Sequence, residues 1–191
     1  MREFLALVGR LKTQLRTGWT RYLPDGARCE SVSDHMYRMS ILCFTAPANL
    51  NRDRCVRMAL VHDLCEAICG DMVLVSDLEN EEDAKTILSV RSKTEKHEIE
   101  KKSLAVIVDA LPENLEHLKL EIVELWEEYE NQSTDEARFV KECDKLEMIV
   151  QASDYEHQYP SINLGEFYRG VRGLIKTPHL LDVQKEVDKE Q

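Results

Sequence analysis

The chain contains few of the residues that interrupt regular secondary structure. Seven glycines and five prolines are spread over 191 residues, about half the share of an average globular protein. A β-sandwich or barrel needs a turn at about every 8–12 residues, and glycine and proline form most such turns. This scarcity excludes a many-stranded β architecture and predicts an all-α fold.

The length and the apolar pattern predict one domain without a membrane segment. A chain of 191 residues and 22.1 kDa is long enough for one hydrophobic core and short for two. We therefore interpret residues 1–191 as a single domain. The longest apolar stretches are about as long as residues 41–44. A membrane span requires roughly 18 apolar residues, so no membrane partner is expected.

Charge and cysteine usage restrict the partners and the compartment. The net charge is −11, and the chain lacks the broad basic face of a nucleic-acid-binding protein. Residues 1–21 carry five basic residues against one acidic residue, which suits a small anionic ligand. The six cysteines include no CxxC pair and no export signal precedes them, so we expect reduced thiols in a cytoplasmic protein. The less favoured alternative is a mitochondrial protein, since the basic N-terminus faintly resembles a presequence.

Apolar residues recur at helical spacing along most of the chain. Helices are expected over about 4–15, from Ser31 or Ser33 to before Pro47, over 51–70 and 81–110, over 115–129, from the Ser133–Glu136 capping box onward, and more weakly over 164–175 and 180–187. Residues 17–28 and 72–80 are expected to be loops. Leu60 and Leu64 should anchor the third helix, and Ile87 and Val106 the fourth.

A His-Asp pair interrupts the apolar run of residues 59–67. Burying a charge costs several kcal/mol unless it is paired or bound to a metal. Adjacent helical residues lie about 100° apart, so His62 and Asp63 can both bind a metal between their sectors. Glu66, one turn later, points into the same sector.

His35 and Asp144 are the candidates for the remaining ligands, because each lies near the apolar seam of a predicted amphipathic helix. Taken singly, each is better explained as a hydrogen-bonded core residue. The residues alone therefore leave both the metal-binding and the structural interpretation open.

The order His35, His62-Asp63, Asp144 resembles that of the HD-domain metal-dependent phosphohydrolases. The motifs at residues 16–19, 30–38, 60–66, 70–71 and 125–130 resemble, more narrowly, the 5′-deoxynucleotidase branch of that family. The match covers roughly residues 3–175 and is weak in the tail, 176–191. The resemblance implies a compact helical array, a homodimer, and hydrolysis of 2′-deoxynucleoside 5′-monophosphates to deoxynucleoside and phosphate.

The resemblance also implies one divalent metal ion, held by His35, His62, Asp63 and Asp144. Two imidazoles and two carboxylates suit Mn²⁺, Co²⁺, Fe²⁺ or Zn²⁺ without choosing among them. The family favours Co²⁺ or Mn²⁺.

Further residues take roles in this interpretation. Glu66 would orient or deprotonate the attacking water, and Arg16 would bind the phosphate through its guanidinium. Trp19 would exclude a ribose 2′-hydroxyl, and Asp71 would hold the 3′-hydroxyl. Each of these residues also has a purely structural interpretation. Arg16 would complement a helix dipole, Trp19 would fill the core, and Asp71 would form a turn. Asp34 and Glu147 would either orient neighbouring side chains or face solvent.

Two other functions remain open. One is an HD-type phosphatase or phosphodiesterase acting on another nucleotide or phosphorylated metabolite. The other is a non-catalytic, nucleotide-binding helical protein, against which the presence of Glu66 argues. Other branches fit less well: Ala67 stands where alarmone hydrolases have a second acid, and Cys65-Glu66 where triphosphohydrolases have Gly-His.

Overall fold

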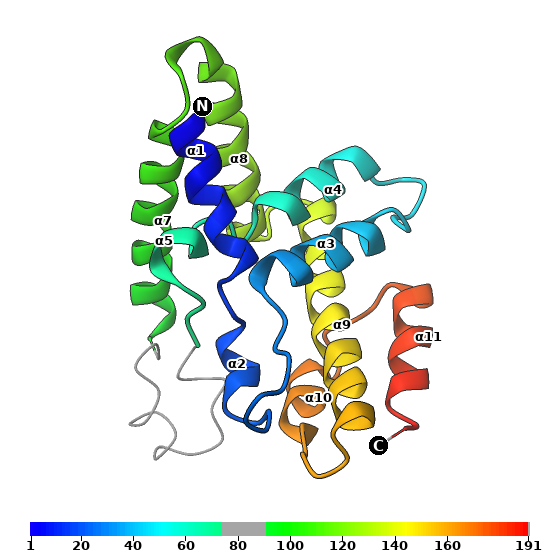
Figure 1. The fold of residues 1–191 in the computed structure, drawn as a ribbon. Helices are drawn as coiled ribbons and strands as arrows, with labels where there is room; N and C mark the ends of the chain where they lie inside the picture. Colours follow the sequence, from blue (N-terminus) through cyan, green and yellow to red (C-terminus); the bar gives the residue numbers. More distant parts are fainter. Residues whose placement is uncertain (74–90, 191) are drawn as a thin grey trace.

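The computed structural model describes residues 1–73 and 91–190, and the regular structure in these ranges is helical (Figure 1). The α-helices are α1 (Arg2–Val8), α2 (Thr17–Thr20), α3 (Val32–Cys43), α4 (Arg52–Val61), α5 (Glu66–Cys69), α7 (Lys93–Asp109), α8 (Glu116–Asn131), α9 (Asp135–Gln158), α10 (Gly165–Val171) and α11 (Pro178–Val187). Two 3₁₀ turns, η1 (Gly9–Lys12) and η3 (Glu113–Leu115), join them. No β-strand occurs within the described ranges, and the prediction of an all-α fold is confirmed.

The N-terminal region departs from the predicted helix over 4–15. Helix α1 ends at Val8 and tightens into η1. Leu15 then pairs in an isolated bridge with Ser31, because the Val32 N–H donates to Gln14 O at 2.8 Å on one side of this bridge. The loop predicted over 17–28 contains the short helix α2.

The predicted helix over 51–70 is broken at the His-Asp pair. Helix α4 ends at Val61, residues 62–65 form turns, and α5 begins at Glu66. Leu60 is 50% exposed, so its prediction as a core anchor is wrong, whereas Leu64 is buried as expected. Gly70 ends α5 at φ +75°, a conformation that favours glycine.

Helix starts follow side-chain caps. Ser31 accepts the Asp34 N–H, and Asp34 accepts the Ser31 N–H in return, which selects Ser31 over Ser33 as the start of α3. At α9 the cap is Thr134, which accepts the Ala137 N–H. The predicted capping box from Ser133 is wrong by one residue, since the position three residues after Thr134 is an alanine without an acceptor.

Helix α7 corresponds to the described part of the helix predicted over 81–110. Ser92 caps it, while Ile87 lies outside the described residues. Val106 is 55% exposed, so it is not an anchor; Leu104 and Ile107, at most 2% exposed, fill the core instead. The face of α7 that carries Val106 is therefore exposed, and the face that carries Leu104 and Ile107 is the buried one.

The buried apolar side chains form two clusters. The cluster around α9, called the α9 cluster, includes residues of α3, α4, α8, α9, α10 and α11. The cluster around α7, called the α7 cluster, includes residues of η1, α3, α5, α7 and α8. Met58 and Ala59 belong to the α9 cluster, and Leu64 and Cys65 to the α7 cluster. The chain therefore crosses from one cluster to the other at His62-Asp63.

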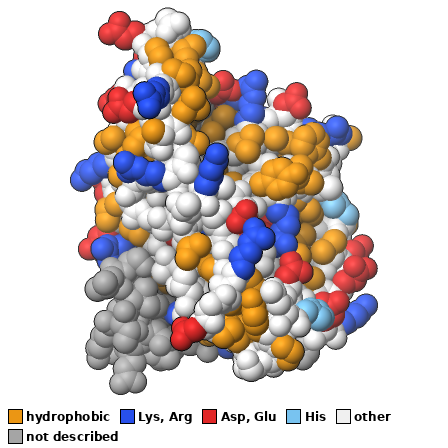
Figure 2. Space-filling model, in the orientation of Figure 1, with side chains coloured by type: hydrophobic (Ala, Val, Ile, Leu, Met, Phe, Trp, Pro, Cys, Tyr) orange, Lys and Arg blue, Asp and Glu red, His pale blue; other side chains and the backbone are white. Residues whose placement is uncertain are grey.

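The surface in Figure 2 intersperses basic and acidic side chains, with apolar side chains between them. Among the described residues, no helix has the length and apolar character required to span a bilayer.

Candidate active site

Three ligand-type side chains converge at the junction of α3, α4 and α9. One donor atom each from His35, His62 and Asp144 lies within 4.8 Å of the other two. His35 is in the first turn of α3, His62 directly follows α4, and Asp144 lies in the middle of α9. His35 Nε2 is 3.5 Å from Asp144 Oδ1. All three residues are buried.

Both imidazoles are held by their Nδ1 atoms. His35 Nδ1 lies 2.5 Å from Glu147 Oε2, and His62 Nδ1 lies 2.9 Å from Ala59 O. These contacts turn both Nε2 atoms toward the site, where they are buried without a well-formed hydrogen bond and face the carboxylates of Asp63 and Asp144. Buried nitrogens are rarely left unpaired, and imidazoles oriented in this way are typical of metal ligands.

Glu147 contacts His35 directly, whereas Asp34 is exposed and affects only the start of the helix that carries His35. Glu147 is 2% exposed, and its other carboxylate oxygen accepts a bond from Arg38 Nε at 2.8 Å. Burial raises the pKa of Glu147, but His35 and Arg38 outweigh that effect and lower it. Asp34 fixes the start of α3 through its capping interaction with Ser31.

Asp63 faces both imidazoles and also contacts Arg16. Its Oδ2 lies 3.0 Å from His62 Nε2, 3.8 Å from His35 Nε2 and 3.3 Å from Arg16 Nη1. Burial raises the pKa of Asp63, but the neighbouring His62 and Arg16 lower it by more, so the net shift is downward. Asp63 is not one of the three donors that lie within 4.8 Å of one another, and its carboxylate also pairs with the Arg16 guanidinium.

Asp144 is held by two residues that the sequence analysis did not single out. Its Oδ2 accepts a bond from the Tyr129 hydroxyl at 2.9 Å and pairs with Lys141 Nζ at 3.0 Å. Lys141 in turn donates to the Tyr129 hydroxyl at 2.8 Å. One carboxylate oxygen is thus occupied, and Oδ1 remains directed at His35.

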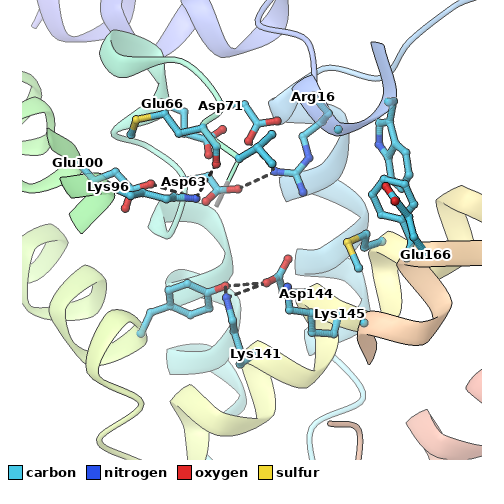
Figure 3. Close-up of a pocket in the computed structure, with 18 of the residues that line it drawn as sticks. Arg16, Asp63, Glu66, Asp71, Lys96, Glu100, Lys141, Asp144, Lys145 and Glu166 are labelled. Atoms are coloured by element: carbon cyan, nitrogen blue, oxygen red, sulfur yellow. Dashed lines mark hydrogen bonds and ion pairs between the residues drawn. The ribbon is translucent and has the colours of Figure 1, made fainter. Parts of the chain in front are cut away.

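A cavity of about 570 Å³ opens beside these ligands (Figure 3). All of the predicted site residues except the two buried histidines line it: Arg16, Trp19, Asp63, Glu66, Asp71 and Asp144. It also contains five cations absent from the predicted site: Arg21, Lys96, Lys141, Lys145 and Arg169. Their helical spacing resembles that of ordinary solvated charges, so only the tertiary structure shows that they gather here.

Glu66, the first residue of α5, is 1% exposed, and its Oε2 has no hydrogen-bond partner. Burial raises its pKa, and the neighbouring carboxylates of Asp63 and Asp71 raise it further. Lys96 approaches from α7, where its Nζ donates to Met72 O at 3.2 Å and lies 3.4 Å from Glu100. A raised pKa favours the protonated form of Glu66 in the chain as it stands, and the cations Arg16 and Lys96 act in the opposite direction.

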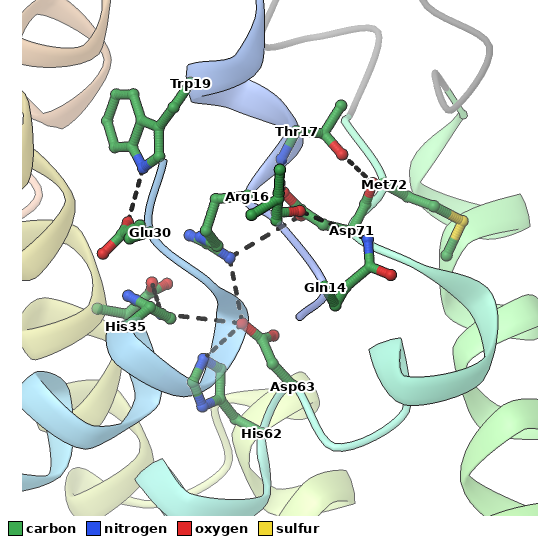
Figure 4. A network of polar contacts seen from close by, with 12 residues as sticks. Gln14, Arg16, Thr17, Trp19, Glu30, His35, His62, Asp63, Asp71 and Met72 are labelled. Carbon is green, nitrogen blue, oxygen red and sulfur yellow. Dashed lines mark hydrogen bonds and ion pairs between the residues drawn. The ribbon is translucent and has the colours of Figure 1, made fainter. Parts of the chain in front are cut away.

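Arg16 is positioned by the start of α2 (Figure 4). Asp71 Oδ2 accepts the Thr17 N–H at 2.6 Å, and the Thr17 hydroxyl donates to Asp71 O at 2.8 Å. The Arg16 N–H donates to Glu30 O at 3.2 Å. One carboxylate oxygen of Asp71, Oδ2, is thus occupied by the Thr17 N–H, and the other, Oδ1, lies 3.9 Å from Arg16 Nη1.

Trp19 is both a core residue and part of the cavity wall. It is 2% exposed, and its Nε1 donates to Glu30 Oε1 at 2.6 Å. Its ring lies 4.4 Å from that of Phe167 and 5.7 Å from that of Tyr155, between centroids. Glu30 is buried, and burial together with Glu147 raises its pKa to about 7.

Comparison with known proteins identifies related chains. A model of the HD domain family matches residues 8–178. The chain is 41% identical over 191 residues to human 5′-deoxynucleotidase HDDC2, across 99% of this chain and 85% of the relative. It is 40% identical over 178 residues to 5′-deoxynucleotidase YBR242W of Saccharomyces cerevisiae, across 91% and 68% of the two chains. A solved structure, a conserved hypothetical protein from Pyrococcus furiosus, aligns over 99% of both chains with a TM-score of 0.72 and 30% identity.

Proposed function

The chain belongs to the HD domain family, and we propose that it is a metal-dependent 5′-deoxynucleotidase, a phosphoric monoester hydrolase acting on 2′-deoxynucleoside 5′-monophosphates. The observation that carries this proposal is the pair of buried, unpartnered Nε2 atoms of His35 and His62 beside Asp144. Relatives about 40% identical over nearly the whole chain bear the name of this activity.

The residues present fit a divalent metal ion. We propose that His35, His62, Asp63 and Asp144 hold it, which would pair both orphaned nitrogens and offset the buried carboxylates. Such an ion acts as a Lewis acid and lowers the pKa of a water ligand. The mixed imidazole and carboxylate donors suit Mn²⁺, Co²⁺, Fe²⁺ or Zn²⁺, with Co²⁺ or Mn²⁺ favoured by resemblance.

The remaining side chains supply binding and proton transfer. Arg16 binds the phosphoryl oxygens and neutralises the charge that develops on them. Glu66 orients the attacking water and accepts its proton at the unpaired oxygen. The bond from phosphorus to the 5′-oxygen breaks, and that oxygen takes up a proton to leave as the deoxynucleoside.

Trp19 and Asp71 are proposed to contact the sugar. The indole cannot rotate freely, because Glu30 fixes its nitrogen and Phe167 packs on its ring. A ribose 2′-hydroxyl against this surface would lose its hydrogen bonds to water without gaining a partner. Asp71 would offer the carboxylate oxygen that Thr17 does not use to the 3′-hydroxyl.

A homodimer remains a prediction. Tyr37 and Ile41 of α3 and Phe44 directly after it are 68%, 49% and 55% exposed, and an exposed apolar surface of this kind supports self-association. Sedimentation equilibrium of the purified chain would decide between a dimer and a monomer.

The decisive experiment measures phosphate release from a panel of ribo- and deoxynucleoside mono-, di- and triphosphates. Metal-free protein, prepared with a chelator, receives each candidate metal in turn. We expect turnover only with added metal and the highest kcat/KM for deoxynucleoside monophosphates. Preferred release from a sugar phosphate or a phosphodiester would assign the site to another phosphohydrolase, and binding without release would assign it to a non-catalytic protein.

A further inference from the structure

The cavity has two chemically different ends. Lys96 and Glu100 lie on one side of Arg16 and Asp63, and Glu166 lies on the opposite side (Figure 3). The first end, formed by α7 and α8, presents charged groups, including Glu130, which pairs with His97 of α7 at 3.1 Å, and the Tyr129 ring, which Lys141 and His62 already contact. The other end, formed by α2, α9 and α10, presents Trp19, Met148, Phe167 and two glycines beside the charged residues Arg21, Lys145, Glu166 and Arg169.

Phe167 is the aromatic residue of the second end that retains partial exposure. Its ring is packed edge-on by Tyr22 at 5.8 Å and tilted against Trp19 at 4.4 Å. Residue 18 is a glycine, and a Cβ at this position would lie 3.5 Å from the Phe167 ring. A longer side chain at residue 18 would therefore cover this ring, which glycine leaves open toward the cavity.

The charged groups beside this ring are already paired. Glu166 Oε1 accepts bonds from Arg21 Nη2, at 2.8 Å, and from the Tyr22 hydroxyl. This arrangement holds α2 against α10, so both walls of the second end are fixed relative to each other. Beside these charges, this end offers a ligand the partly exposed ring of Phe167, and every nucleobase can stack on such a surface.

We propose that the α10 end of the cavity is the nucleobase subsite and that Phe167 is its stacking surface. The inference rests on the proposed function, since a nucleotide presents phosphate, sugar and base in that order. With the phosphate at Arg16 and the sugar beside Trp19, the base reaches Phe167, whose ring directly adjoins the Trp19 ring. At the α7 end the same base would lie among Lys96, Glu100 and Glu130.

The test compares a substrate that has a base with one that lacks it. Values of kcat/KM are measured for 2′-deoxyadenosine 5′-monophosphate and for 2-deoxyribose 5-phosphate. The variants are Phe167→Ala, Phe167→Leu, which retains apolar bulk, and Phe167→Tyr, which retains the ring. Glu130→Gln serves as the matched control at the other end of the cavity.

We expect Phe167→Ala and Phe167→Leu to lower the ratio of the first substrate to the second by about ten- to hundred-fold, as for loss of one base–aromatic stack. Phe167→Tyr and Glu130→Gln should retain the wild-type ratio. General disruption of the fold would instead lower both substrates together and leave the ratio unchanged in Phe167→Leu, which would overturn the proposal.

Two other outcomes also decide the matter. A ratio that falls in Glu130→Gln and not in the Phe167 variants would place the base at the α7 end and overturn the proposal. Failure of the wild-type chain to hydrolyse any deoxynucleotide would refute the proposed function itself. That result differs from an active wild-type enzyme whose ratio of kcat/KM values is unchanged by substitutions at Phe167, which would refute the base subsite alone.

Discussion

Glu66 is an acid buried at the edge of the cavity, with one carboxylate oxygen unpaired. The Glu66→Gln substitution preserves its shape and removes the proton acceptor. We expect kcat to fall by about 10²- to 10⁴-fold, the usual contribution of a general base, while metal content and the unfolding transition stay as in the wild type. Steady-state kinetics and elemental analysis on one preparation would show this.

Glu100→Gln is the matched control for this variant, because Glu100 is also a buried carboxylate of the cavity wall but pairs with Lys96. It should retain most of the activity. A Glu66→Gln enzyme as active as this control would mean that another group activates the water.

Glu30 makes stability depend on pH. Its pKa in the folded chain is raised from the ordinary 4.5 to about 7 by burial and by Glu147, so between these values the folded state holds a proton that the unfolded state has lost. Stability from this group is complete below about pH 4.5 and is lost as the pH rises through 7. The loss amounts to about 3 kcal/mol, at about 1.4 kcal/mol per pKa unit.

Glu30→Gln keeps an acceptor for the Trp19 indole and does not titrate. Urea unfolding from about pH 5 to pH 8 should show the wild type losing free energy of unfolding relative to the variant as the pH rises. Parallel curves for the two proteins would show that Glu30 is already ionised in the folded chain.

At the scale of elements, helix α2 carries Trp19, directly follows Arg16, and is held at its start by Asp71 from the segment after α5. Trp19→Ala should narrow the deoxy-to-ribo ratio of kcat/KM, since the excluded 2′-hydroxyl is worth roughly 1–3 kcal/mol. Asp71→Asn should weaken both series equally, because it loosens the α2 start and affects no group at the 2′ position. A Trp19→Ala enzyme with the full ratio would assign selectivity to other residues.

Elements with long amphipathic patterns were predictable from the sequence. Helices α3 and α8 lie where the apolar spacing predicts them, and Ser31, one of the two expected starts, caps α3; Asn51, where the third predicted helix begins, caps α4. The break at residues 62–65 was not predictable, because Ala59, Leu60 and Leu64 continue the apolar period across it. The turn forms where the chain passes between two core clusters, and that requirement is tertiary.

The site residues also divide into those that the local sequence predicts and those that only the tertiary structure shows. His35, His62, Asp63 and Asp144 were identified by residue type and motif order. Tyr129, Lys141 and Lys96 are not predictable from the sequence. The pairs Lys141–Asp144 and Lys96–Glu100 have the i,i+3 and i,i+4 spacing of ordinary helix-surface pairs, and only the tertiary packing turns these side chains toward the cavity. Glu30 lies in the motif at residues 30–38, but nothing local in the sequence indicates its bond to the Trp19 indole.

At the scale of the whole molecule, the proposed metal ligands join three separate helical regions, so binding should stabilise the fold. Metal at about 100 times its Kd adds about 2.7 kcal/mol, which is about 5–10 °C in Tm for a chain of this length. Chelation should remove this increment. Asp63→Ala and His62→Ala should lack both the increment and the bound metal, and full metal occupancy in both variants would disprove the four-ligand assignment.

The crossing at His62-Asp63 places the proposed reaction on the boundary between the two core clusters, which are joined by helices α3 and α8. A slight shift of α5, which belongs to the α7 cluster, would move Glu66 relative to Asp144 while leaving both cores dry. Catalytic geometry tolerates displacements of only about 1 Å, far less than packing does. On heating, turnover should therefore decline several degrees before the near-ultraviolet circular dichroism signal does, so that this enzyme stops working while it is still folded.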